Sequence, residues 1–332
     1  MIFRFGLIGF ALFVAGLSCA YLYSQSALSD IEQRYPASGR FVNISGTQIH
    51  YTDNEAAIGG QGVPIVLLHG ASTSLMDYEA SIAPPLRQTH RVIALDRPGY
   101  GYSERPSGPW VDPRQQADLV VGLLDNLGIQ QAVVVGHSLG GAVTMALAVH
   151  HPERLAGLVL LGGVSHPWKS GVAWTNHLAG IPLLGTLFGH TLLVPSARVV
   201  MPEAIEEVFA PNSVPARYVE RAHVELSIRP EALQSSAQDL RLLSPYLEVQ
   251  KKRYGELKMP ILLITGAHDT VVPAWNHSER LERLLSQVQL VSLPETGHAP
   301  HHARTDQVVA LIKDFVDERA LRTPEVQIPK VD

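Results

Sequence analysis

Short runs of mostly apolar residues recur along the chain and alternate with longer segments that have a helical pattern. We interpret the runs as strands at residues 64–68, 91–95, 132–135, 155–161, 261–265 and 288–293. Runs with so few polar positions are typical of strands buried on both faces, as in a parallel sheet covered by helices. The pattern therefore predicts an α/β fold with helices on both faces of a mostly parallel sheet.

Two further patterns fit this fold. Residues 40–44 and 47–51 alternate apolar and polar positions around Ser45-Gly46, which is typical of a β-hairpin. Residues 112–127 carry apolar positions at helical spacing and end at Gly128, a residue that commonly terminates helices.

The alternation is interrupted at residues 166–246, a stretch rich in Pro, Trp, Leu and His that contains no clear strand. It carries helical patterns at 204–209, 216–227 and 232–243. This stretch divides the core into a first part at 39–165 and a second part at 247–321, as an inserted helical lid would.

Within the expected lid, residues 178–194 are mostly apolar. They would line an acyl pocket, contact a bilayer or form the core of the lid itself. Pro182 and His190 argue against a second spanning helix.

The N-terminal segment 1–23 is the most apolar part of the chain, and Arg4 precedes its apolar run at 5–23. The run is close to the ~20 residues of a spanning helix, and the preceding cation favours a cytoplasmic N-terminus. The small residues Ser18 and Ala20 also fit a signal peptide cleaved after Ala20. We therefore predict a membrane anchor, with an exported protein as the alternative, and the body on the extracytoplasmic side in both cases. Residues 24–38 are polar and predict a linker, and 322–332 predict a C-terminal tail.

Charge and cysteine content narrow the possible partners. The net charge is −5 and there is no basic run, which argues against a nucleic-acid partner. The single cysteine, Cys19, rules out an internal disulfide. Nothing in the sequence predicts an oligomeric state.

The most informative motif is Gly136-His137-Ser138-Leu139-Gly140, which follows the valine-rich run at 132–135. A serine at such a strand-to-helix corner sits on a strained turn that exposes its hydroxyl. A serine at a helix start is otherwise often an N-cap. The strand before it and the glycines beside it favour a nucleophile.

Two further residues complete the pattern for serine catalysis. His298, in Thr296-Gly297-His298, follows the last predicted strand and is the candidate base. Asp269 follows the run at 261–265 and is the candidate acid, so the chain order is Ser, Asp, His. The alternative position for the acid, after the run at 155–161, holds no carboxylate.

Other polar groups near these motifs have more ordinary interpretations. His301 and His302 follow the candidate base, but His298-x-x-His301-His302 lacks a carboxylate partner in the sequence, so we predict no metal site. We expect both residues to be solvated or to pack near the mouth of the site. His69 and His137 would pack beneath their loops.

The oxyanion of an acyl-transfer reaction needs backbone N–H donors. Gly70 follows the predicted strand at 64–68 and lets the chain bend, which would aim the N–H of Ala71 into the pocket. The N–H of Leu139, directly after the candidate nucleophile, would be the second donor.

The ordered set of motifs resembles the α/β-hydrolase family. The residues that carry the resemblance are His69-Gly70, the turn Asp96-Arg97-Pro98-Gly99-Tyr100-Gly101-Tyr102-Ser103, the motif around Ser138, Asp269 and Gly297-His298. The resemblance implies an eight-stranded, mostly parallel sheet with a helical lid and no cofactor. It also implies that the turn at 96–103 is structural.

The serine at the nucleophile position narrows the range of possible reactions. Dehalogenases and epoxide hydrolases of this family carry an aspartate at the nucleophile position, whereas a serine suits acyl carbonyls. We therefore expect a serine hydrolase that cleaves a carboxylic ester or related acyl bond of a small, apolar substrate. The alternatives are a carbon–carbon bond hydrolase, a perhydrolase or a non-catalytic binding protein.

Overall fold

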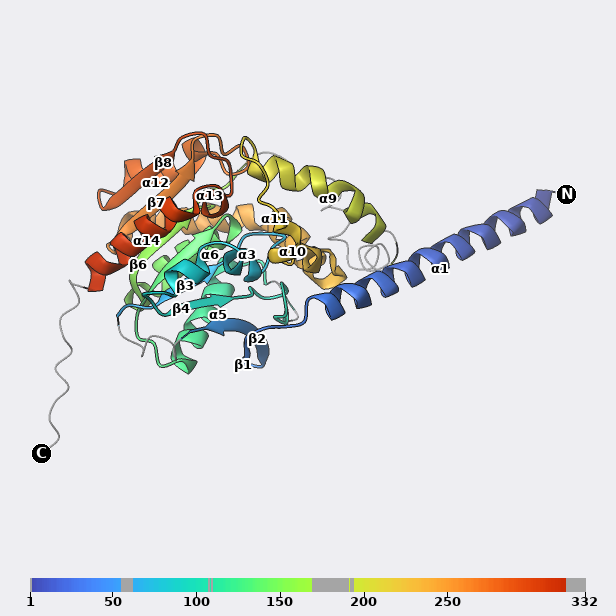
Figure 1. Ribbon diagram of the computed structural model, residues 1–332, viewed down its shortest axis with the longest axis horizontal. Coiled ribbons are helices and arrows are strands. Elements are labelled where there is room, and N and C mark those ends of the chain that lie inside the picture. Colours follow the sequence, from blue (N-terminus) through green and yellow to red (C-terminus); the bar gives the residue numbers. More distant parts are fainter. Residues whose placement is uncertain are drawn as a thin grey trace, which may run out of the picture.

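The computed structural model describes residues 2–54, 62–106, 108, 110–168, 191 and 194–320. Eight strands form one sheet in the order β1-β2-β4-β3-β5-β6-β7-β8 (Figure 1). The strands are β1 Arg40–Ile44, β2 Thr47–Asp53, β3 Ile65–Leu68, β4 Val92–Leu95, β5 Ala132–His137, β6 Leu155–Leu161, β7 Ile261–Gly266 and β8 Val288–Leu293. β2 is antiparallel to β1 and β4, and the pairs from β4 to β8 are all parallel. The mostly parallel sheet expected from the sequence is confirmed.

Helices cover both faces of this sheet. The two covering sets are α5 Pro113–Asn126, α6 Leu139–His150 and α12 Ser278–Leu284 on one face, and α3 Met76–Glu79, α4 Ala83–Leu86 and α14 Thr305–Ala320 on the other. Along β3, Val66 and Leu68 pack with the first set, while Ile65 and Leu67 pack with the second. Because side chains alternate between faces, every position of such a strand must be apolar.

The chain between β6 and β7 forms an insertion of helices. Its elements are α9 Val194–Phe209, α10 Tyr218–Arg221, a short 3-10 turn at Val224–Ile228, α11 Pro230–Gln250 and a second turn at Lys251–Glu256. The expected helices at 204–209 and 232–243 lie inside longer ones, and the pattern at 216–227 corresponds to α10 and the following turn. Most of the apolar stretch 178–194 lies outside the described residues.

The boundary that we expected after residue 246 falls inside α11. Pro245 lies within this helix, which nevertheless continues because Leu247 and Gln250 are buried. The Gln250 side chain donates a hydrogen bond to the carbonyl of Ala142 in α6 at 3.2 Å. Packing on the core therefore extends the helix beyond its proline.

The expected linker at 24–38 is largely helical instead. α1 is a single helix from Ile2 to Arg34 that projects from the body (Figure 1). Its last part is buried on one side at Ser24, Ala27 and Ile31, residues that recur every three or four positions. This stripe packs against α9 and the 3-10 turn Val224–Ile228. The segment is therefore held as a helix despite the polar residues on its other sides. Phe10–Arg34 is long and apolar enough to cross a membrane.

Three short elements complete the described fold. They are the 3-10 turns Pro152–Arg154 and Ala274–Asn276 and the helix α13 Pro300–Ala303. The expected C-terminal tail at 322–332 lies outside the described residues.

Candidate active site

Ser138 lies at the corner where β5 passes into α6. Its backbone has φ 50° and ψ −119°, in a region that residues with a side chain rarely adopt. The turn closes tightly because Gly140 has no side chain: a Cβ there would lie 2.1 Å from the carbonyl oxygen of Leu68. The strained corner and the glycine together place the serine at the carboxyl edge of the sheet.

The structure brings together the three residues that the sequence singled out for catalysis. The Ser138 hydroxyl lies 2.9 Å from Nε2 of His298, and Nδ1 of His298 lies 2.8 Å from Oδ2 of Asp269. The other carboxylate oxygen, Oδ1, accepts hydrogen bonds from the backbone N–H groups of Val271 and Val272 at 2.9 and 2.7 Å. The Asp269 carboxylate accepts a hydrogen bond from the N–H at Nδ1 of His298. This bond leaves Nε2 as the nitrogen that can accept the serine proton.

These three residues come from loops after β5, β7 and β8, which end at the same edge of the sheet. The end of β6 lies against them, because a Cβ at Gly162 would lie 3.0 Å from Oδ2 of Asp269. The insertion also contacts the His298 loop: the N–H of His298 donates to the carbonyl of Val208, in α9, at 3.2 Å. The core and the insertion are thus hydrogen-bonded to each other at the candidate base.

The loop after β3, which carries Ala71, passes directly beside Ser138. A Cβ at Gly70 would lie 3.0 Å from Cβ of Ser138. The carbonyl of Gly70 accepts a hydrogen bond from Nη2 of Arg97 at 2.9 Å. Because a trans peptide points its C=O and N–H in opposite directions, this bond directs the N–H of Ala71 away from Arg97. Leu139 begins α6 on the other side of the serine.

Arg97 is a residue whose role the sequence did not reveal. It is 1% exposed, and its Nε donates to the carbonyl of His69 at 2.9 Å. Its charge faces Asp239 of α11, with Nη1 3.2 Å from Oδ2, and Arg105 binds the other oxygen of Asp239 at 2.7 Å. This buried ion pair ties the loop that carries Ala71 to the insertion. The turn at 96–103 is therefore structural, as the resemblance implied, but it also positions the site.

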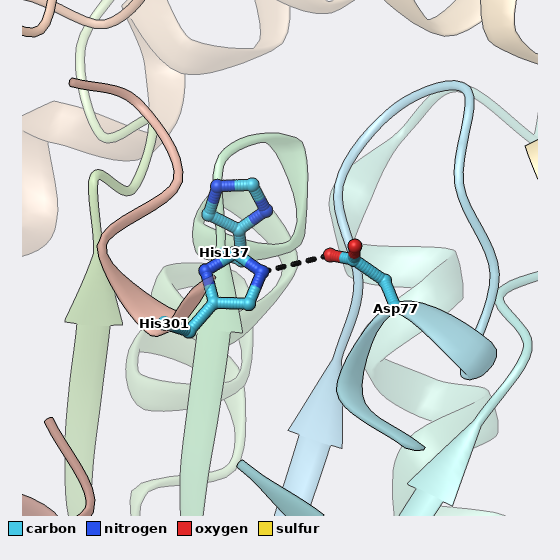
Figure 2. A group of neighbouring side chains, drawn as sticks. All are labelled: Asp77, His137 and His301. Carbon is cyan, nitrogen blue, oxygen red and sulfur yellow. Dashed lines mark hydrogen bonds and ion pairs between the residues drawn. The ribbon is translucent and has the colours of Figure 1, made fainter. Parts of the chain in front are cut away.

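His301 and His302 are not solvated, contrary to one of our expectations. The side chains of both lie against Asp77 of α3 and are shielded from solvent, with Nε2 of His301 2.8 Å from Oδ2 and Nε2 of His302 2.8 Å from Oδ1 (Figure 2 shows the first pair). The hydroxyl of Tyr218 donates to Oδ1 of Asp77 at 3.1 Å. Although burial opposes ionisation, the two histidines hold the pKa of Asp77 well below its ordinary value. The carboxylate partner was missed because it lies more than two hundred residues away in the sequence.

His137 lies beside this cluster and connects it to the base. Its ring centroid is 4.4 Å from that of His301, and its Nε2 lies 3.0 Å from the carbonyl oxygen of His298. Burial, with the nearby His301, holds the pKa of His137 well below its ordinary value, so the ring is neutral. Nε2 therefore carries the proton and donates it to that carbonyl, while Nδ1 lacks a hydrogen-bond partner among the described residues.

Asp77, His137 and His301 are the described residues that could hold a metal ion, since one donor atom from each lies within 4.8 Å of the others. No ligand is needed to explain Asp77, whose carboxylate already accepts three hydrogen bonds. Within the group, Asp77 and His301 are hydrogen-bonded to each other, whereas His137 contacts His301 only through its ring.

An apolar cluster lies next to the two expected oxyanion donors. It joins Leu139 and Ala71 of the core to residues of α11 in the insertion. Its buried members are Val111, Leu139, Ala142, Val164, Leu243, Leu247 and Val272, with Ala71, Trp168, Leu240 and Tyr246 partly buried against them. The part of the site formed by the described residues is therefore apolar on this side.

Comparison with known proteins places these features in context. A family model described as alpha/beta hydrolase fold matches residues 63–305. A 2-hydroxymuconate semialdehyde hydrolase from Pseudomonas putida is 30% identical over 299 residues, which cover 86% of this chain and 96% of that protein.

Two solved structures show the same fold. A meta-cleavage product hydrolase from Pseudomonas fluorescens IP01 has a TM-score of 0.67 at 25% identity, covering 84% of this chain and 98% of its own. A membrane phospholipase A described as a bacterial virulence factor has a TM-score of 0.66 at 20% identity. That likeness concerns the fold alone, and it covers 96% of this chain and 98% of the other.

Proposed function

The chain belongs to the alpha/beta hydrolase fold family, and from this premise we propose that it is a serine hydrolase with Ser138 as its nucleophile. The observation that carries the proposal is the continuous hydrogen-bonded series from Ser138 through His298 to Asp269. Such a series lets one imidazole take the serine proton and later return it.

The proposed reaction begins when Oγ of Ser138 attacks a carbonyl carbon of the substrate. The proton of the hydroxyl moves to Nε2 of His298, and Asp269 stabilises the resulting imidazolium. The N–H groups of Ala71 and Leu139 would stabilise the negative charge on the carbonyl oxygen. The imidazolium then protonates the leaving group, and a water molecule activated by His298 hydrolyses the acyl-enzyme.

Two kinds of bond fit this chemistry. From the sequence we expected a carboxylic ester first, with carbon–carbon cleavage as an alternative. The named relatives favour the alternative: the Pseudomonas putida relative is named as a semialdehyde hydrolase, and the similar structure from Pseudomonas fluorescens is a meta-cleavage product hydrolase. We therefore place carbon–carbon cleavage beside a ketone or aldehyde first and ester cleavage second. The apolar cluster beside Leu139 keeps ester cleavage as the second candidate, because acyl pockets are lined by side chains of this kind.

The remaining parts of the chain have proposed roles in the same activity. Residues 166–246 would act as the lid of the site, and α1 would anchor the protein to a membrane with the body on the extracytoplasmic side. A signal peptide cleaved after Ala20 is the alternative for α1. The apolar length of α1 supports either reading.

A substrate panel tests the proposed reaction. The kcat/KM values of the full chain are measured for nitrophenyl esters of increasing acyl length and for hydroxy-oxo-dienoate ring-cleavage compounds. Turnover of the dienoates above that of every ester supports carbon–carbon cleavage, and the reverse order supports an ester hydrolase. Activity that persists in Ser138→Ala toward both classes would overturn the proposed nucleophile.

A further inference from the structure

We propose that α9 lies on the surface of the bilayer that α1 enters, with Val199 and Val200 in contact with lipid. The inference rests on the proposed role of α1 as an anchor and adds a second contact with the membrane. It commits to a lipid bilayer as the partner of this face of α9.

The first step is that α1 and α9 are held together. The hydroxyl of Ser24 donates to the carbonyl of Thr191 at 2.7 Å in a buried environment. Ala27 and Ile31 pack against Val194 and Ala197 of α9. Figure 1 shows α9 on the side of the body from which α1 projects. The direction of α1 therefore sets the position of the first turns of α9.

The second step is the depth at which the membrane ends. A helix rises about 1.5 Å per residue and needs about 20 residues to cross the ~30 Å hydrocarbon core. Counted from Phe5, the apolar run reaches this length at Tyr23, and Tyr21 and Tyr23 are both exposed. Tyrosine is enriched at the boundary between lipid and water. The boundary therefore lies next to the residues that dock on α9.

The third step is that α9 reaches the same level. Nη1 of Arg198 donates to the hydroxyl of Tyr23 at 2.9 Å, so α9 touches α1 at the expected boundary. The next two residues, Val199 and Val200, are 78% and 58% exposed. Exposed apolar side chains at this depth would be covered by lipid, as in helices that lie in the membrane interface.

The polarity of α9 changes with distance from α1. Val199 and Val200 lie in its first half, whereas its later exposed positions include Glu203, Glu206 and Glu207 beside Pro202 and Ala204. Acidic side chains disfavour contact with a bilayer, particularly one with anionic lipids. The outer face is thus apolar where α9 meets α1 and acidic farther along.

The experiment uses fluorescence quenching by lipid. Because Cys19 is the only cysteine, Cys19→Ser provides a background in which Val199→Cys and Val200→Cys each carry a single environment-sensitive fluorophore. The full chain is reconstituted in vesicles of phosphatidylcholine and phosphatidylglycerol, with and without lipids that carry a spin label near the headgroup. Leu284→Cys is the matched control, since Leu284 is exposed on α12, at the end of the molecule away from α1 (Figure 1). Tyr21→Cys reports on α1 itself.

The expected result is a loss of fluorescence at positions 199, 200 and 21 with spin-labelled lipid, and none at 284. Loss at 21 without loss at 199 and 200 overturns the contact of α9 and leaves the anchor intact. Absence of loss at 21 overturns the anchor, and with it the basis of the inference. Unchanged unfolding temperatures of the labelled variants show that the labels leave the fold intact.

Discussion

The carbonyl oxygen of His298 accepts a hydrogen bond from Nε2 of His137 at 3.0 Å. The residue directly before the candidate nucleophile thereby holds the loop that carries the candidate base. The distance between the Ser138 hydroxyl and the His298 imidazole depends on the loop of each residue. The hydrogen bond from His137 connects these two loops and so helps to set that distance.

Replacing His137 by leucine removes the donor and leaves the His298 carbonyl buried without its partner. We expect a loss of ~1–3 kcal/mol in the free energy of unfolding, the usual cost of a buried polar group left unpaired. We also expect a lower kcat, because the base loses its support. His150→Leu, at the end of α6, is the control and should leave kcat unchanged. Equal kcat values for both variants would show that the bond does not position the base.

Ser138→Ala and His298→Ala should each abolish nearly all hydrolysis, and the double variant should be scarcely worse than either. Residues that act as one unit in catalysis have strongly non-additive effects. The measurement is kcat/KM for the three variants with the best substrate of the panel. A loss of only tenfold in Ser138→Ala corresponds to about 1.4 kcal/mol, too little for a lost nucleophile.

Asp269→Asn should leave the protein folded but nearly inactive. The asparagine side chain can offer N–H to Nδ1 of His298, which favours the tautomer that cannot accept the serine proton. The unfolding temperature should change much less than kcat does. Near-normal turnover would mean that Asp269 only shapes its turn through Val271 and Val272.

Arg97→Met should lower the free energy of unfolding by ~3–5 kcal/mol, because it removes one partner of a buried ion pair. Arg105 still neutralises part of the Asp239 charge, which favours the lower end of this range. The double variant Arg97→Met with Asp239→Leu should recover part of the loss in urea unfolding. Activity should stay low in both, since the carbonyls of His69 and Gly70 lose their donor. Full activity in the double variant would show that Arg97 is not needed to position the loop that carries Ala71.

The protein should begin to lose stability at a pH well above the range in which carboxylates titrate, because of two buried histidines. Burial, together with the Arg97 cation, lowers the pKa of His69 to about 4, and burial lowers the pKa of His277 to about 4. Both rings must be neutral: Nε2 of His69 accepts from the N–H of Arg97, and Nδ1 of His277 accepts from the N–H groups of Ser165 and His166.

The unfolded chain binds a proton at each of these histidines below pH ~6.5, whereas the folded chain does so only near pH 4. The stability from their neutral forms is therefore complete above pH ~6.5 and falls as the pH drops toward 4, by up to ~1.4 kcal/mol per pH unit for each group. Urea unfolding at pH 7, 6 and 5 measures the slope. His277→Gln keeps an acceptor without a titrating group and should reduce the slope; an unchanged slope would contradict the assignment to His277.

The sheet was predictable because each strand carries its own local pattern, and the run before Ser138 leads directly into its glycine turn. The candidates Ser138, His298 and Asp269 could be picked out for the same reason, since each follows a strand that is recognisable on its own. Asp77 and Arg97 could not, because their roles depend on partners far away in the sequence, on α13 and α11. The end of α1 was missed because its buried stripe is sparse and is visible only once α9 lies against it.

The contact of α1 with α9 determines where a shortened chain without the apolar segment can begin. A chain that begins at Gly39 would lose Ala27 and Ile31 and expose the apolar residues Val194 and Ala197 that they cover. A chain that begins at Tyr21 would keep the whole stripe, together with the Ser24 hydrogen bond. Cleavage after Ala20 would leave that same chain, so the anchored and the exported forms would share one folded body. The useful boundary for a soluble fragment therefore lies within a helix, not at its end.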